Sequence, residues 1–245
     1  MEFNTQSNNV EIVAHRGYAA LYPENTMVAF RRSLELGADT IELDIHYSKE
    51  GIPVVIHDDT LDRTTTSSGS IRKLSLQDIR QADAGVKFSP EFVGSQVPLL
   101  EEALDLCSGR AGLQLELKET ITESEGRALL HLLKVHDMLD HTMIISFIFT
   151  NLTLMRELHP HIELGFLTDK RVSLQPLHEL GHATCCFSSS LAMNHPDMLE
   201  EATSLGIDRA VWTIRDEETA IKLYKLGIRR LTSDIPLTQE MFTSI

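Results

Sequence analysis

Val13-Ala14-His15-Arg16-Gly17, followed by Pro23-Glu24-Asn25-Thr26, is the stretch around which the rest of this chain is organised. The apolar run over residues 10–14 predicts a buried strand. Gly17 suits a backbone that turns sharply there or passes close to a ligand. The second motif predicts a helix start, with Asn25 or Thr26 as its N-cap. A titratable histidine and a permanently charged arginine therefore adjoin where a strand meets a loop, although His-Arg-Gly alone is equally compatible with a solvated loop.

On either side of each predicted helix, a short apolar run is found, so that apolar runs alternate with helical patterns along the chain. The predicted strands cover residues 10–14, 40–46, 113–118, 142–147, 162–167, 183–187, 210–214 and 229–233. The predicted helices cover residues 25–36, 99–107, 123–135, 151–158, 174–180, 196–204 and 217–226, with a last turn after Pro236. This order favours an α/β fold, the closed (β/α)₈ TIM barrel. A doubly wound open sheet is the alternative, disfavoured by short strands and the lack of a Gly-rich dinucleotide loop.

One region interrupts the alternation after the second strand. A turn at residues 49–51 predicts a hairpin into residues 53–56, and a long polar segment with one short helix near residues 75–82 then follows. We expect residues 58–98 to form a small inserted subdomain that caps the mouth of the barrel. The predicted organisation is a flexible arm over residues 1–9 and one TIM-barrel domain over residues 10–245, within the size of about 250 residues typical of such barrels.

Composition excludes several classes of partner. The net charge of −14 would repel nucleic acid and anionic membranes, so neither is an expected partner. We expect no membrane span, because no stretch approaches about 18 apolar residues, and residues 1–9 do not read as a signal peptide. The three cysteines, Cys107, Cys185 and Cys186, are odd in number and two are adjacent, which predicts reduced thiols in a cytoplasmic protein.

Carboxylates on two neighbouring strands predict a metal site. Side chains alternate along a strand, so Glu42, Asp44 and His46 share the face opposite Ile41, Leu43 and Ile45. In a barrel the apolar face packs on helices and the carboxylates point inside, whereas in an edge strand they would face solvent. The third strand repeats this pattern with Gln114, Glu116 and Lys118. Glu42, Asp44 and Glu116 suit a hard cation, Mg²⁺ or Ca²⁺, and Lys118 is placed to bind a phosphate oxygen beside it.

Two histidines fall at the same rim. His57 follows the hairpin strand, and His15 follows the first strand. Either one alone is compatible with a structural role. Beside a carboxylate cluster, two imidazoles that titrate near neutral pH can divide the duties of general acid and general base.

Taken together, these motifs resemble those of the glycerophosphodiester phosphodiesterases. The resemblance rests on the two opening motifs, on Gly37-Ala38-Asp39 leading to residues 42–46, on residues 54–65 and on Leu115-Glu116-Leu117-Lys118. Val211-Trp212-Thr213 and residues 232–236 continue it in the same order. It covers nearly the whole chain after residue 10.

The resemblance implies a TIM barrel with a small insertion and hydrolysis of a small-molecule glycerophosphodiester to an alcohol and sn-glycerol 3-phosphate. It also implies one divalent cation on Glu42, Asp44 and Glu116, catalytic His15 and His57, and phosphate contacts from Arg16 and Lys118. Trp212 is a candidate for the wall of the glycerol pocket, or is plain barrel core.

Three segments depart from the family's pattern: Arg215 stands where Asn is frequent, and Ser146-Phe147-Ile148 and Ser188-Ser189-Ser190 differ from the usual loops. They bear on substrate preference. A lysophospholipase D-like activity on lipids and a non-catalytic binding barrel are the rival hypotheses. The sequence leaves open the headgroup, the order in which the histidines act, attack by water or by the substrate's own 2-hydroxyl, and the oligomeric state.

Overall fold

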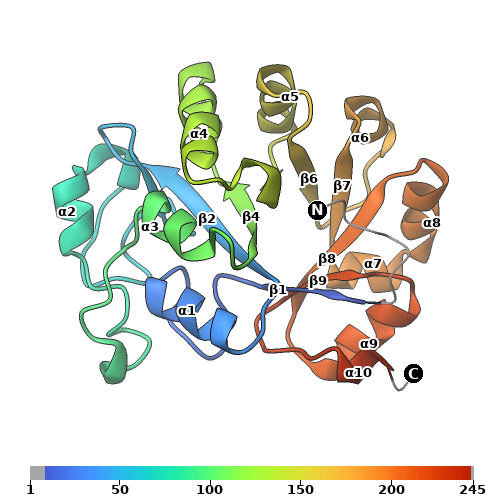
Figure 1. The fold of residues 1–245 in the computed structure, drawn as a ribbon, viewed down its shortest axis with the longest axis horizontal. Coiled ribbons are helices and arrows are strands. Elements are labelled where there is room, and N and C mark those ends of the chain that lie inside the picture. Colours follow the sequence, from blue (N-terminus) through green and yellow to red (C-terminus); the bar gives the residue numbers. More distant parts are fainter. Residues whose placement is uncertain (1–8, 244–245) are drawn as a thin grey trace.

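Eight parallel strands close into a barrel in the computed structural model, which describes residues 9–243 (Figure 1). The barrel strands are β1 (Glu11–Ala14), β2 (Thr40–Tyr47), β4 (Gly112–Leu117), β5 (Thr142–Ser146), β6 (Glu163–Thr168), β7 (Ala183–Ser188), β8 (Asp208–Ile214) and β9 (Arg230–Ser233). Closure occurs at β1, where Val13 pairs with Thr40 of β2 and with Thr232 of β9. Because β1 has a parallel neighbour on both sides, the predicted TIM barrel is confirmed and the open sheet is excluded.

Helices surround the barrel in the connections between strands (Figure 1). They are α1 (Met27–Glu35), α3 (Leu100–Cys107), α4 (Glu123–Val135), η3 (Leu139–His141), α5 (Phe149–Leu158), α6 (Gln175–Leu180), α7 (Ser189–Asn194), α8 (Pro196–Ser204), α9 (Glu217–Lys225) and α10 (Glu240–Thr243). Helix α7 falls where the sequence predicted only a loop. Its cause is local, since the Ser188 hydroxyl accepts a hydrogen bond from the Leu191 amide at 3.2 Å and caps the helix.

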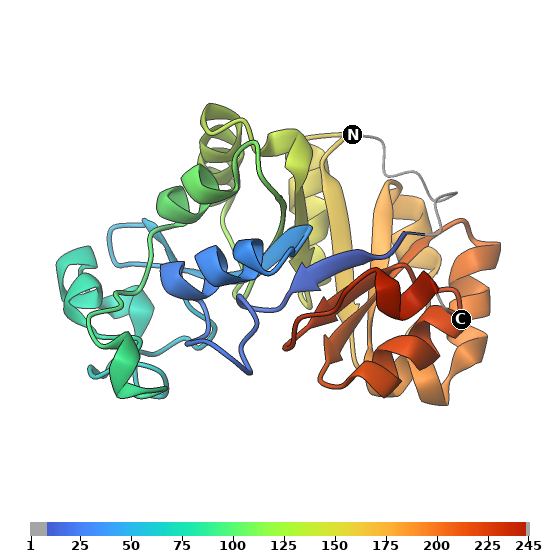
Figure 2. The ribbon, with the colours of Figure 1, turned by 60° about the horizontal axis from the view of Figure 1, so that its bottom comes forward.

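Residues 58–98 pack around a small core of their own. Strand β3 (Pro53–Val55) pairs antiparallel with β2, and η1 (Ile71–Lys73), α2 (Leu76–Gln81) and η2 (Pro90–Phe92) follow it. Leu61, Ile71 and Ile79 are buried together with Val54 and Ile56. Figure 2 shows this segment, in cyan to green, to one side of the barrel. The division into an arm, a single domain and an inserted subdomain stays a prediction, and the arm lies outside the described residues except for Asn9.

The barrel interior is layered from one end to the other. At the amino ends of the strands, the buried Arg230 side chain bonds Glu11 and, at 3.0 Å, Glu163. Above this layer lies an apolar cluster that includes Ile145 and Leu167. Further polar side chains gather toward the carboxyl ends, the end of a TIM barrel where catalytic residues are usually found. Among the described residues, no helix has both the length and the apolar character required to cross a bilayer.

Candidate active site

A pocket opens at the carboxyl ends of the barrel strands and encloses about 440 Å³ of empty space, part of it open to solvent. It brings together most of the predicted site residues with an apolar floor. Its lining comprises His15, Arg16, Glu42, His57, Gln114, Glu116, Lys118, Ile145, Phe147, Leu167, Cys186, Ala210, Trp212 and Thr232.

Three carboxylates converge at this pocket, two in its lining and Asp44 directly behind them. One oxygen from each of Glu42, Asp44 and Glu116 lies within 4.8 Å of the others, and all three residues are buried. The register places them there, because Asp44 of β2 pairs directly with Glu116 of β4 and Glu42 lies one interior position deeper. Lys118 Nζ lies 2.7 Å from Glu116 and 3.5 Å from Asp44.

Burial and mutual repulsion make this cluster electrostatically unfavourable by itself. Burial, followed by repulsion from Asp44, raises the pKa of Glu42 well above its usual value. The same two causes raise the pKa of Glu116 to about 7. Burial also acts to raise the pKa of Asp44, but Arg16 and Lys118 outweigh it and hold that pKa well below the usual range. A cation among these carboxylates would relieve the repulsion.

The donor set fits a hard divalent cation. All three groups offer oxygen, which Mg²⁺ and Ca²⁺ prefer. Asp44 Oδ2 accepts a hydrogen bond from the Asn25 amide at 2.8 Å. Asp44 Oδ1 is buried and accepts none from residues 9–243, although the Lys118 ammonium lies 3.5 Å away. A buried carboxylate oxygen without a hydrogen bond is costly unless another ligand occupies it.

The loop after β1 is shaped by its backbone. Arg16 has a φ of +49°, and Gly17 has a φ of +81°. A Cβ on Gly17 would lie 2.7 Å from the Ala29 side chain of α1, so this position requires glycine. The turn directs the Arg16 amide to Glu42 at 2.9 Å and its Nε to within 3.2 Å of Asp44. Thr26, not Asn25, caps α1, which leaves Asn25 to support Asp44.

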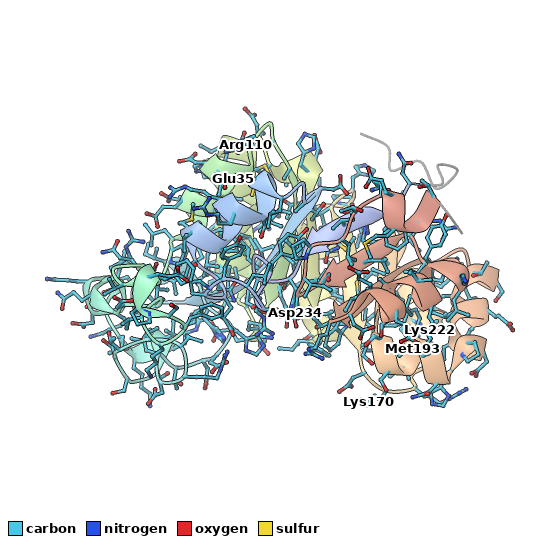
Figure 3. The ribbon with its side chains drawn as sticks, turned by 90° about the horizontal axis from the view of Figure 1, so that it is seen from below. Glu35, Arg110, Lys170, Met193, Lys222 and Asp234 are labelled. Atoms are coloured by element: carbon cyan, nitrogen blue, oxygen red, sulfur yellow. The ribbon has the colours of Figure 1, made fainter. Side chains whose placement is uncertain are left out.

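His15 is held by a carboxylate from the far end of the chain. Its Nδ1 lies 2.6 Å from Asp234 Oδ1, directly after β9. The other Asp234 oxygen accepts from Arg215 Nε at 3.1 Å. Because Nδ1–H donates to Asp234, Nε2 is the nitrogen left for a ligand. Figure 3 labels Asp234 near the middle of the molecule, between the segment of residues 58–98 and the C-terminal helices.

His57 is held in the same way by its sequence neighbour. Its Nδ1 lies 2.7 Å from Asp58 Oδ1, and the Asp58 carboxylate accepts two hydrogen bonds from Arg63. Burial lowers the pKa of His57, and the Arg16 charge adds to this, although Asp44 and Asp58 act against it. A neutral imidazole with a free Nε2 can accept a proton.

The remaining wall of the pocket is aromatic. Trp212 and Phe147 meet edge to face with ring centroids 5.3 Å apart, and the Trp212 Nε1–H donates to the Cys186 carbonyl at 2.9 Å. Deeper in the barrel, Gln114 is buried and accepts from the Thr232 hydroxyl at 3.3 Å. The Gln114 Nε2 donates to no residue of the described chain, so the pocket floor offers a hydrogen-bond donor to a ligand.

The structure thus brings the predicted site residues into one pocket, with Asp44 directly behind them. Those in the lining are His15, Arg16, Glu42, His57, Glu116, Lys118 and Trp212. His46 shares the inward face of β2 but lies outside this lining, and its Nε2 bonds the His57 carbonyl at 3.1 Å. Sequence reasoning missed the supporting residues. Asn25 was considered only as one of two possible helix caps, beside Thr26, and Asp58, Arg63 and Asp234 were noted only as parts of motifs. Adjacency to His57 was a usable signal for Asp58, but none marked Asp234.

Comparisons with known proteins agree with this geometry. Residues 15–238 match the sequence model of the glycerophosphoryl diester phosphodiesterase family. A glycerophosphodiester phosphodiesterase of Caldanaerobacter subterraneus is 32% identical over 231 residues, covering 93% of this chain and 95% of the relative. One from Bacillus altitudinis is 31% identical and covers 92% and 95%. An Oleispira antarctica phosphodiesterase, solved in complex with the product sn-glycerol-3-phosphate, superposes with a TM-score of 0.87 at 31% identity, covering 97% of each chain.

Proposed function

Because this chain belongs to the glycerophosphoryl diester phosphodiesterase family, we propose that it hydrolyses small-molecule glycerophosphodiesters with a divalent cation and a pair of histidines. The observation that carries the proposal is the convergence of three buried carboxylates with two carboxylate-held imidazoles in one pocket. Hydrolysis breaks the bond between phosphorus and the alcohol oxygen and yields an alcohol and sn-glycerol 3-phosphate.

Glu42, Asp44 and Glu116 are the residues that would hold the cation, Mg²⁺ or Ca²⁺. When bound, such an ion neutralises phosphoryl oxygens and stabilises the charge that develops on them. Arg16 and Lys118 contribute to the same end, because each already lies beside a carboxylate of the cluster and carries donors that suit phosphate.

His15 and His57 divide the proton transfers. One imidazole takes a proton from the attacking hydroxyl, and the other gives a proton to the departing alcohol oxygen. The lowered pKa of His57 favours its neutral form and therefore the role of base. The attacking group is water or the substrate's own glycerol 2-hydroxyl; the latter gives a cyclic phosphate that water then opens.

Trp212 and Phe147 provide the flat surface against which a glycerol carbon chain can lie. If the cations and the aromatic wall contact the glycerol phosphate half, as proposed, the alcohol half is left with few contacts. We therefore expect broad tolerance of the alcohol, with choline, ethanolamine and glycerol esters cleaved within about tenfold of one another. We place the reaction in the cytoplasm, supported by three free, buried cysteines.

The test is one assay of kcat/KM on glycerophosphocholine, glycerophosphoethanolamine, a lysophospholipid and bis(p-nitrophenyl) phosphate, with and without chelator. EDTA should abolish hydrolysis, and Mg²⁺ or Ca²⁺ should restore it. Glu42→Ala should match the chelated enzyme with its fold retained. Full activity after exhaustive chelation would refute the metal role, and preference for the lysophospholipid or the nitrophenyl ester would replace the proposed substrate class.

A further inference from the structure

One guanidinium joins the His57 side of the pocket to the Arg16 side. Arg63, in the segment of residues 58–98, donates to both oxygens of Asp58, through Nε at 2.7 Å and through a terminal nitrogen at 2.8 Å. It also donates to both oxygens of Glu24 at 2.8 Å. Asp58 holds His57, and Glu24 accepts from Arg16 at 3.1 Å. All three guanidinium nitrogens are used, in two bidentate pairs.

The backbone on both sides of Arg63 in the sequence is held in place by buried neighbours. Leu61 belongs to the buried core of its segment, and Thr65 is buried with its hydroxyl donating to the Leu61 carbonyl at 2.8 Å. The Arg63 side chain is itself 47% exposed, but its partners Glu24 and Asp58 are only 20% and 26% exposed. A bidentate network of this kind is more ordered than an isolated surface ion pair.

The charges in this network are matched. Arg63 pairs with both Glu24 and Asp58, and Arg16 pairs with Glu24. The Arg63 hydrogen bonds hold the pKa of Asp58 well below its usual range. Without Arg63, Glu24 would keep one cationic partner and Asp58 would keep only the imidazole of His57. A lysine could not replace the arginine, because a single ammonium cannot span both carboxylates with parallel hydrogen bonds.

We propose that Arg63 is a positioning residue for the phosphodiesterase reaction, fixing His57 and Arg16 relative to each other across the mouth of the pocket. In this arrangement the segment of residues 58–98 supports the active site through Arg63. The inference rests on the proposed function, since it assigns Arg63 to the support of that same site.

The chain offers a matched control. Arg80 lies in the same segment, donates to both oxygens of Glu102 and to the Val97 carbonyl, and fastens the segment to α3 without touching the pocket. Arg63→Ala, Arg63→Lys and Arg80→Ala are compared for kcat and KM on glycerophosphocholine with Mg²⁺. The tautomer of His57 is read in each protein by nitrogen NMR of ¹⁵N-histidine-labelled protein.

Arg63→Ala and Arg63→Lys should lose between about tenfold and about 100-fold in kcat, whereas Arg80→Ala should stay within twofold. Free guanidinium, compared with equal sodium chloride, should restore part of the activity of Arg63→Ala and none of Arg63→Lys. The His57 nitrogen signals should change in the Arg63 variants and not in Arg80→Ala. Unchanged His57 signals in Arg63→Ala overturn the inference even if the enzyme proves inactive, and an inactive wild type with changed signals refutes only the proposed function.

Discussion

Each of the two histidines of the pocket is held by a hydrogen-bonded chain of the same three residue types, His–Asp–Arg. The two chains differ in how many partners the terminal arginine has. His57, Asp58 and Arg63 form one chain, and His15, Asp234 and Arg215 form the other. In the first chain, the arginine is locked by a second carboxylate, Glu24. In the second, Arg215 is 72% exposed and has only Asp234 as a partner among residues 9–243.

This difference indicates what orients the aspartate behind each histidine. Asp234 itself is only 13% exposed and directly follows a barrel strand, so the barrel orients it without help from Arg215. Asp58 lies on a segment outside the barrel and requires a partner that ties it back. We therefore expect replacement of the arginine to matter more on the inserted side, at Arg63, than on the barrel side, at Arg215.

The largest loss of activity should come from replacing the histidine of either hydrogen-bonded chain. His15→Ala and His57→Ala should each lower kcat at least about 100-fold, because each removes a proton carrier. Both variants should still bind sn-glycerol 3-phosphate in a calorimetric titration, since Arg16 and Lys118 remain. Near wild-type turnover in either variant would show that this histidine is not part of the acid–base pair. The two hydrogen-bonded chains would then not have equivalent roles.

A smaller effect is expected at the exposed end of the barrel-side chain. Arg215→Gln should lower kcat at most about fivefold, because an exposed ion pair is worth no more than about 1 kcal/mol. Steady-state rates measured beside Arg63→Ala would sharpen the contrast. Equal losses in the two variants would show that burial of Asp234 does not suffice to orient His15.

The smallest effect concerns stability and pH. Hydrogen bonds from Arg63 lower the pKa of Asp58, a shift that burial partly offsets. A carboxyl whose pKa is depressed on folding contributes stability above its unfolded pKa, about 3.9, and loses it as pH falls through the folded value. Arg63→Ala should therefore be less stable than wild type near neutral pH, and this difference should shrink below about pH 4. Urea unfolding at both pH values tests this, and a constant difference would contradict it.

Local patterns were enough to predict the barrel and its cluster of three carboxylates. Side chains alternate along a strand, so the order Glu42, Leu43, Asp44 was sufficient to place both carboxylates on one face. Parallel pairing of consecutive strands then brought Glu116 beside them. The hydroxyl-capped α7 was missed, because three serines at residues 188–190 are as typical of a loop as of a helix start.

The supporting contacts depended on how distant segments meet. Asp234 lies 219 positions from His15, and the two become neighbours only because β1 and β9 pair when the barrel closes. Glu24 and Arg63 are 39 positions apart and meet because residues 58–98 fold back over the loop after β1. Residue type and spacing therefore identified most of the groups that gather at the pocket, because alternation and motif order are local properties. Closure of the barrel and packing of the insertion selected their partners, because those contacts join segments that no local pattern links.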